Sequence, residues 1–224
     1  VILENWGHPD LEKIYIDEKK IAQDAGQTGN VGIIGWYVPT WFAEQYPDVV
    51  QDYKNLNKYA DLFKTTESGD KGQFLGTDPS YVQYDEALVK NLGLDFKVIF
   101  TGSENATIQS IKQAVDQKKP LLFYWWEPHW LNATVDLTRI ALPAYSEGCD
   151  ADKEKVACDY PETPLNKIIS TFPQEVPEFL VEMLDHSMAK QHSLCRSNSS
   201  NPFHCRFSQE LILLFADHGC TQKQ

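Results

Sequence analysis

The sequence predicts an α/β fold, and the clearest evidence lies in residues 96–126. An apolar strand (96–100, FKVIF) precedes an amphipathic helix (105–119), and a second strand follows at 120–126 (PLLFYWW). The second strand is a continuous apolar run, as expected of a strand that is covered on both faces. A strand, a helix and a strand within about thirty residues form a βαβ unit. The length of 224 residues allows one large domain or two smaller lobes.

The segments before this unit also alternate between strands and helices. A short strand is predicted to end at Trp6, and a buried strand is predicted over 31–38 (VGIIGWYV), stopped by Pro39. The cluster GQTGN (26–30) between them is predicted to form a turn. A helical turn is expected after Thr40, which is a favourable N-cap residue.

The next segments predict partial helix over 48–63, an exposed polar loop over 65–73, and a loop that leads into a helix. Tyr84, Leu88 and Leu92 lie four residues apart on one face of that helix, and Gly93 can end it.

Residues 163–188 predict two helices separated by Pro173 and Pro177. Residues 186–224 differ from the rest of the chain: their net charge is +2, against −14 for residues 1–185. We expect this tail to be atypical and poorly ordered.

Charge and motifs exclude several functional classes. The net charge of −12 argues against binding to nucleic acid or to anionic membrane surfaces. The sequence has no apolar run near 18 residues, so no membrane insertion by this segment is expected. Nucleophile-elbow, phosphate-loop, zinc-protease and dinucleotide motifs are absent. Glu127 beside His129 could form an acid/base pair, but residues two apart on a turn need not converge, so we expect no enzyme.

Cys149 and Cys158 flank a short charged loop, CDADKEKVAC. The eight residues between them suit a small disulfide loop better than a zinc knuckle, although two free thiols remain an alternative. No metal and no cofactor are expected.

The segment 123–130 (FYWWEPHW) is unusually aromatic. Its second half, 126–130, lies at the carboxyl end of the predicted strand, where ligands bind in open α/β sheets. Because Trp125 and Trp126 are adjacent, they point to opposite faces of that strand. One interpretation is a packed aromatic core with one hydrogen-bonded histidine. The other is an aromatic box for a quaternary ammonium group, which has no N–H to donate and is held by the faces of Trp and Tyr.

Five segments, in order, resemble the substrate-binding proteins of glycine betaine, proline betaine and choline ABC transporters. WWEPHW followed by DLTRI resembles the Trp-x-Pro-His/Tyr-Trp motif of that family. ENW, GIIGWYVP, GTDPSYVQYDEA and CDYPETPLNKI resemble four further family segments. The resemblance covers about residues 1–180.

The resemblance implies a type II periplasmic-binding-protein fold with two α/β lobes and the ligand cleft between them. It further implies that the sequence lacks the family's N-terminal part. Residues 1–30 would end the first segment of lobe one, 31–125 would form lobe two, 126–185 would return to lobe one, and 186–224 would be the atypical tail.

The resemblance also implies the ligand-binding residues. Trp6 and Trp126 match cage tryptophans, and Tyr81 stands where many members have a third Trp. His129 matches a residue that binds the ligand's carboxylate in some members, and an N–H donor suits that role. Trp36, Trp41, Trp125 and Trp130 are expected to pack.

The implied function is an extracytoplasmic solute receptor. It would capture a quaternary ammonium compound and deliver it to an ABC transporter permease subunit, closing by hinge bending. A ligand-sensing ectodomain without transport is the alternative that the same cage would serve.

Overall fold

The structure is a computed structural model, and it describes residues 1–171. The strands are β1 (Ile2–Asn5), β2 (Ala22–Pro39), β3 (Gly72–Gly76), β4 (Phe96–Phe100), β5 (Leu122–Glu127), β6 (Leu137–Arg139) and β7 (Thr163–Ser170). The α-helices are α1 (Pro9–Glu12), α2 (Thr40–Gln45), α3 (Pro47–Gln51), α4 (Asp85–Asn91) and α5 (Glu104–Asp116). A π-helix follows α1 (Lys13–Glu18), and 3-10 helices span Tyr53–Phe63 and Trp130–Ala133.

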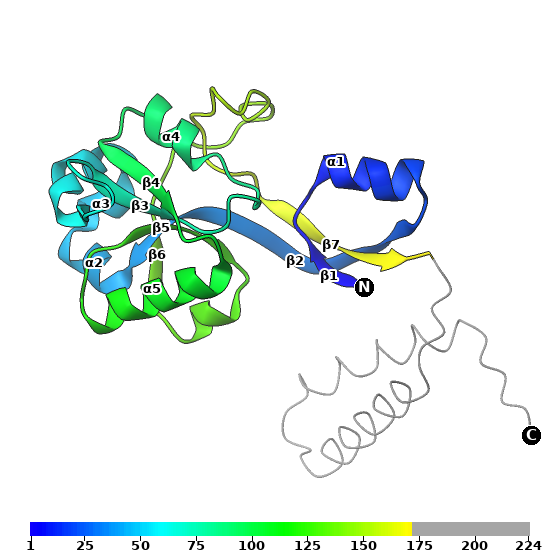
Figure 1. The fold of residues 1–224 in the computed structure, drawn as a ribbon, viewed down its shortest axis with the longest axis horizontal. Helices are drawn as coiled ribbons and strands as arrows, with labels where there is room; N and C mark the ends of the chain where they lie inside the picture. The colour runs from blue at the N-terminus through cyan, green and yellow to red at the C-terminus, as the bar shows by residue number, and fades with distance from the viewer. Residues whose placement is uncertain (172–224) are drawn as a thin grey trace, which may run out of the picture. The chain divides into compact units, whose positions relative to one another are not determined.

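The strands form a mixed sheet in the order β1-β7-β2-β5-β3-β4, with β6 paired to β2 (Figure 1). Strand β3 runs parallel to both β4 and β5, whereas β2 is antiparallel to β5. The βαβ unit predicted around α5 is present, and β3 lies between its two strands. The α/β class that the sequence predicts is confirmed.

Strand β2 connects two parts of the sheet. Its second half pairs with β5 and β6, and its first half pairs with β7, which also pairs with β1. The turn predicted over 26–30 is wrong, because these residues belong to β2. The glycines instead allow an irregular strand. The register between β2 and β7 shifts on both sides of Gln27, and Gly26 and Gly29 have positive φ angles.

Two further strands differ from the sequence prediction. The sequence predicts no strand over 72–76, because a short run flanked by glycines shows no period, yet β3 is the central parallel strand. The sequence also predicts a helix over 163–170, but these residues form β7. The adjacent β-branched Ile168 and Ile169 suit its pairing with β1 and β2.

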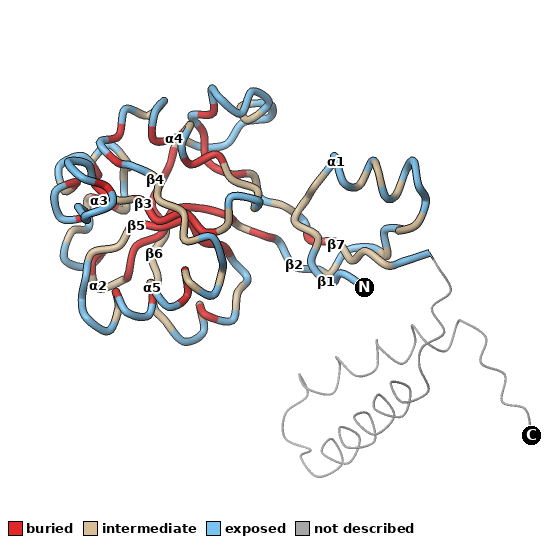
Figure 2. Tube along the Cα trace, viewed as in Figure 1, coloured by how far each residue is buried: buried red, intermediate tan, exposed pale blue. Residues whose placement is uncertain are grey.

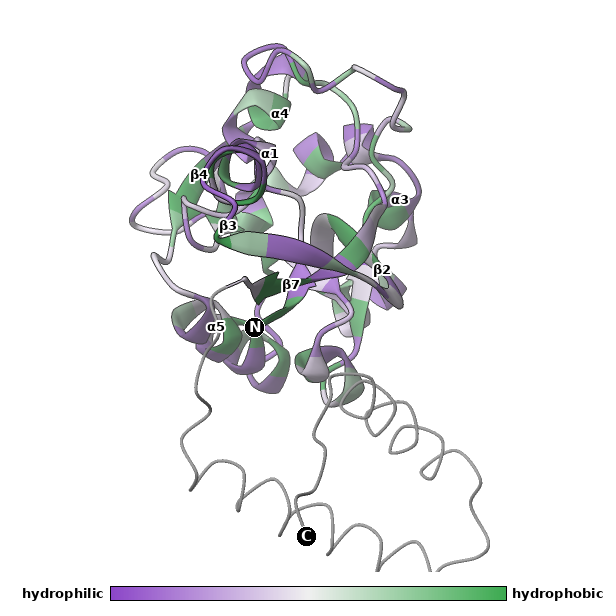
Figure 3. Cartoon of the chain, turned by 90° about the vertical axis from the view of Figure 1, so that its right-hand side faces the viewer, coloured by the Kyte–Doolittle hydropathy of each residue, from purple (hydrophilic) through white to green (hydrophobic). Residues whose placement is uncertain are grey.

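Burial concentrates where helices cover the parallel strands (Figure 2). Trp36, Phe74, Phe123 and Trp125 are fully buried there, and α5 directs Ile108 and Ile111 inward. Apolar and polar stretches lie side by side on α5, as expected of an amphipathic helix (Figure 3). Strand β1 is exposed over most of its length.

The domain boundaries expected from the sequence fall inside strands: 30/31 lies within β2, and 125/126 lies within β5. The expected tail (186–224) and the second expected helix lie outside the described residues. Among residues 1–171, no helix combines the length and apolar character needed to cross a membrane. The structure joins Cys149 to Cys158 by a disulfide.

Candidate functional site

A cavity of about 370 Å³ lies at the carboxyl edge of the parallel strands. Strand β3 leads to the loop that carries Tyr81, β4 leads to Glu104 at the start of α5, and β5 ends in Trp126 and the His129 turn. Because β3, β4 and β5 are parallel, these ends meet at one edge, where α/β sheets bind ligands. The residues that line the cavity are Glu4, Trp6, His8, Ile34, Tyr81, Val82, Glu104, Tyr124, Trp126 and His129.

Thus the four residues that the sequence analysis assigned to the ligand, Trp6, Tyr81, Trp126 and His129, all line this one cavity. They come from positions up to 123 residues apart (from 6 to 129). The volume lies within the usual range for small-molecule sites, roughly 300–1,000 Å³.

Trp126 is positioned by β5. Its ring centroid lies 5.7 Å from that of Tyr81, with the planes at 77°, and 5.2 Å from that of His129, at 81°. The adjacent Trp125 is fully buried, and its Nε1 donates to Asn132 Oδ1 at 2.8 Å. Trp126 lines the cavity and Trp125 does not, but the expected separation to opposite faces is not seen: the two ring centroids lie 4.4 Å apart, so Trp125 packs directly behind Trp126.

Tyr81 is held in place through the loop that bears it. The hydroxyl of Tyr124 donates to the backbone carbonyl of Val82 at 2.9 Å, which fixes the loop to β5. At the end of the loop, the rings of Tyr84 and Tyr160 stack with centroids 4.3 Å apart.

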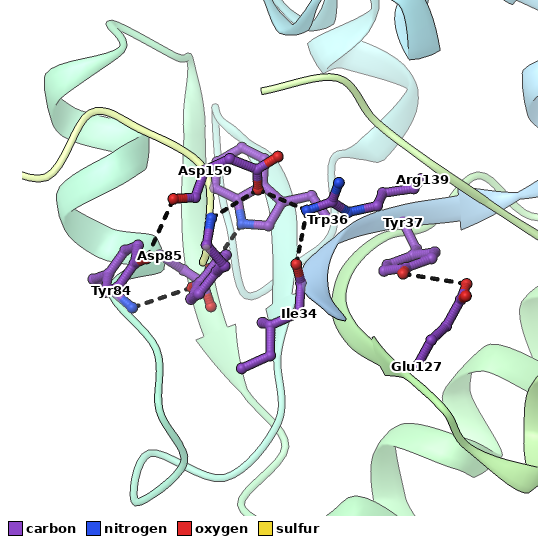
Figure 4. A network of polar contacts seen from close by, with 9 residues as sticks. Ile34, Trp36, Tyr37, Tyr84, Asp85, Glu127, Arg139 and Asp159 are labelled. Atoms are coloured by element: carbon purple, nitrogen blue, oxygen red, sulfur yellow. Dashed lines mark hydrogen bonds and ion pairs between the residues drawn. The ribbon is translucent and has the colours of Figure 1, made fainter. Parts of the chain in front are cut away.

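The residue after Tyr84 is Asp85, the first residue of α4, which also helps to hold this loop and belongs to the polar network of Figure 4. Its Oδ1 accepts hydrogen bonds from Trp36 Nε1 and Tyr160 Oη, each at 2.7 Å. Its other oxygen has no partner among the described residues. Burial raises the pKa of Asp85 to about 6, although both hydrogen bonds act to lower it.

Trp6 reaches the cavity from the turn after β1 and lies across β2 at Gly32. A Cβ atom at this position would clash with two ring carbons of Trp6 and would lie 2.9 Å from Leu165 Cδ2. The absence of a side chain at Gly32 therefore gives Trp6 its place against the sheet.

His129 takes part in two hydrogen bonds. Its Nδ1 accepts the backbone N–H of Leu131 at 3.0 Å, so Nε2 is the nitrogen that bears the donating proton. Nε2 lies 3.1 Å from Glu104 Oε1. The other carboxylate oxygen of Glu104 accepts from the Tyr81 hydroxyl at 3.3 Å. Burial first, and then the charge of Glu104, raise the pKa of Tyr81, which keeps this hydroxyl a donor.

Glu104 and Tyr124 were not identified from the sequence. Tyr124 lies two residues before Trp126, so the strand period places both on one face. Glu104 opens the helix that follows a parallel strand, a position that faces the ligand edge. Both positions could therefore have been proposed from the sequence, but only knowledge of the strand order shows that they meet at the same cavity.

The other tryptophans divide between core and surface. Trp36 and Trp125 are buried, as expected, and Trp41 packs against Phe42 with ring centroids 5.7 Å apart. The packing role expected of Trp130 is wrong, because its exposed fraction is 56%. Its ring instead lies 5.1 Å from the ammonium group of Lys112.

Solved structures of transporter-binding proteins resemble this chain in part. One is a glycine betaine/L-proline-binding protein, ProX, from Borrelia burgdorferi (18% identity, 79% of this chain and 58% of that one, TM-score 0.49). Another is a choline-binding protein of an ABC transporter in complex with choline (19% identity, 78% of this chain and 56% of that one, TM-score 0.49). A third is lactococcal OpuAC in complex with glycine betaine (17% identity, 96% of this chain and 77% of that one, TM-score 0.49). The chain therefore spans less than two thirds of the length of the first two proteins.

The sequence itself identifies the family. Residues 3–188 match the model of the substrate binding domain of the ABC-type glycine betaine transport system. Members of this family serve transporters rather than catalyse reactions, and a two-lobed fold is typical of them. The chain therefore belongs to the family of substrate-binding domains of ABC-type glycine betaine transport systems.

Proposed function

We propose that this chain captures a quaternary ammonium compound in an aromatic cage formed by Trp6, Tyr81 and Trp126. The observation that carries the proposal is that all three rings line one cavity at the carboxyl edge of the sheet. A quaternary ammonium group offers no hydrogen bond. Its attraction to the ring faces contributes roughly 0.5–2 kcal/mol per contact, more when the cation is desolvated.

His129 belongs, in this proposal, to the polar end of the ligand site. The imidazole lies beside Trp126 and directs Nε2 into the cavity lining, toward Glu104. A group attached to the quaternary nitrogen would meet this end while the methyl groups face the rings.

The chain would serve, we propose further, as an extracytoplasmic receptor that delivers its ligand to the permease subunit of an ABC transporter. Family membership supports this role, since members work with such transporters.

Isothermal titration calorimetry of the purified chain with tetramethylammonium, choline and glycine betaine tests the cage, with glycine as the control ligand. We expect binding of trimethylated compounds and none of glycine. Two matched variants locate the site. Trp126→Phe should raise the dissociation constant about three- to tenfold, because Phe offers a weaker ring face. Trp41→Phe, in α2 and outside the cavity lining, should leave the affinity of the folded protein near that of the wild type.

The cage is refuted if the folded chain binds no trimethylated compound. Equal losses of affinity in the Trp126 and Trp41 variants would remove Trp126 from direct contact with the ligand.

A further inference from the structure

We propose that Glu104 makes this cavity selective for quaternary ammonium compounds that lack a carboxylate, such as quaternary ammonium alcohols, over zwitterionic betaines. The inference rests on the proposed function, because it concerns which ligand the same cage accepts. It follows from the hydrogen-bond partners of Glu104 and from the charges around the cavity.

Glu104 already occupies the donors that a ligand carboxylate would need. His129 Nε2 and the Tyr81 hydroxyl both point to its carboxylate, at 3.1 and 3.3 Å. His129 has no second N–H to offer, because its Nδ1 accepts from Leu131. A betaine carboxylate could engage these donors only by displacing Glu104.

The remaining lining offers little to balance a ligand carboxylate. Among the described residues that line the cavity, Glu4 and Glu104 are acidic, His8 is the one imidazole besides His129, and none is a lysine or an arginine. A ligand carboxylate next to Glu104 would place two acceptor-only groups of like charge together. Such an unfavourable contact discriminates against one ligand without strengthening the other.

A hydroxyl group at the same place behaves differently. It can donate to a Glu104 oxygen, and that bond would be charge-assisted. A ligand of net charge +1 is also attracted by both acidic residues, whereas a zwitterion carries its own opposing charge. The side chain of Glu104 is 37% exposed, so solvent weakens both effects without abolishing them.

The test is calorimetric titration of wild type, Glu104→Gln and Glu147→Gln with choline, glycine betaine and tetramethylammonium. Glutamine keeps an oxygen that accepts from His129 and removes the charge. Glu147 is exposed and lies outside the cavity lining, so its variant controls for net charge. Tetramethylammonium has no polar end, so it reports on the aromatic rings and on the charge beside them but not on hydrogen bonding.

We expect the wild type to bind choline more tightly than glycine betaine. Glu104→Gln should shift the ratio of the two dissociation constants toward glycine betaine by about tenfold or more, and Glu147→Gln should leave the ratio unchanged. Tetramethylammonium should lose affinity in Glu104→Gln together with choline.

The inference is overturned if tetramethylammonium binds but the ratio stays the same in Glu104→Gln, or if the wild type prefers glycine betaine. Both results leave the cage intact. Failure of all three ligands to bind the folded chain would instead overturn the cage, and the selectivity inference with it.

Discussion

The close approach of Trp6 to Gly32 means that a substitution at Gly32 can displace the Trp6 ring without altering Trp6 itself. Gly32 does not have a positive φ angle, so alanine can adopt its backbone conformation without strain. The added Cβ would nevertheless clash with the Trp6 ring. Trp6 is only half-buried in the turn after β1, so it can move away more readily than the paired strand can.

Gly32→Ala should therefore displace Trp6 from the cavity. Loss of one cation–ring contact of about 0.5–2 kcal/mol corresponds to a roughly two- to thirtyfold higher dissociation constant for choline. Stability should fall by about 1–3 kcal/mol at most, the usual range for an overpacked site, because Trp6 can yield. Calorimetric titration and thermal unfolding measure the two effects.

The matched control is the same substitution in a Trp6→Ala background. Once the ring is absent, the close contact that remains is with Leu165 Cδ2 at 2.9 Å, the end of a flexible side chain that can shift, so Gly32→Ala should no longer weaken binding. If the substitution weakens binding equally in both backgrounds, its effect comes from the strand rather than from Trp6, and the reasoning fails.

Two further predictions concern stability. The raised folded-state pKa of Asp85, about 6 against an ordinary 3.8, means that its stabilising contribution is full below pH 3.8 and is lost as pH rises through 6. The free energy of unfolding of the wild type should therefore fall by on the order of 3 kcal/mol between pH 4 and pH 7, and Asp85→Asn should remove this fall. Urea unfolding at several pH values measures it, and a variant with the same pH profile as the wild type would contradict the assignment. Reduction of the Cys149–Cys158 disulfide, which closes a loop with a sequence separation of 9, should lower the free energy of unfolding by about 2–3 kcal/mol. Urea unfolding with and without reductant tests this, and an unchanged free energy of unfolding would contradict it.

Much of the architecture around α5 was predictable because its signals are local. A continuous apolar run, an amphipathic helix and a second apolar strand define the βαβ unit whatever the rest of the chain does. Residue types also suggested a cage, since aromatic rings at the carboxyl end of a strand suit a cation. The family resemblance supplied the four individual residues, and all four line one cavity.

Other elements depended on partners distant in sequence. β3 is too short to show a period, and only its pairing with β4 and β5 makes it a strand. In the same way, the Ile168–Ile169 pair fits a helix or a strand, and pairing with β1 and β2 decides between them.

The sequence by itself thus determined the α/β class, because that class is expressed in local residue patterns, and it supplied the resemblance on which the proposed cage rests. Only the tertiary structure shows that the carboxylate of Glu104 lies in the cavity lining. Glu104 is separated by 23 residues from Tyr81 and by 25 from His129, and it joins them because parallel strands bring their carboxyl ends to one edge. Hydrogen bonds act over about 3 Å, so their partners depend on strand order and register, which no local pattern specifies.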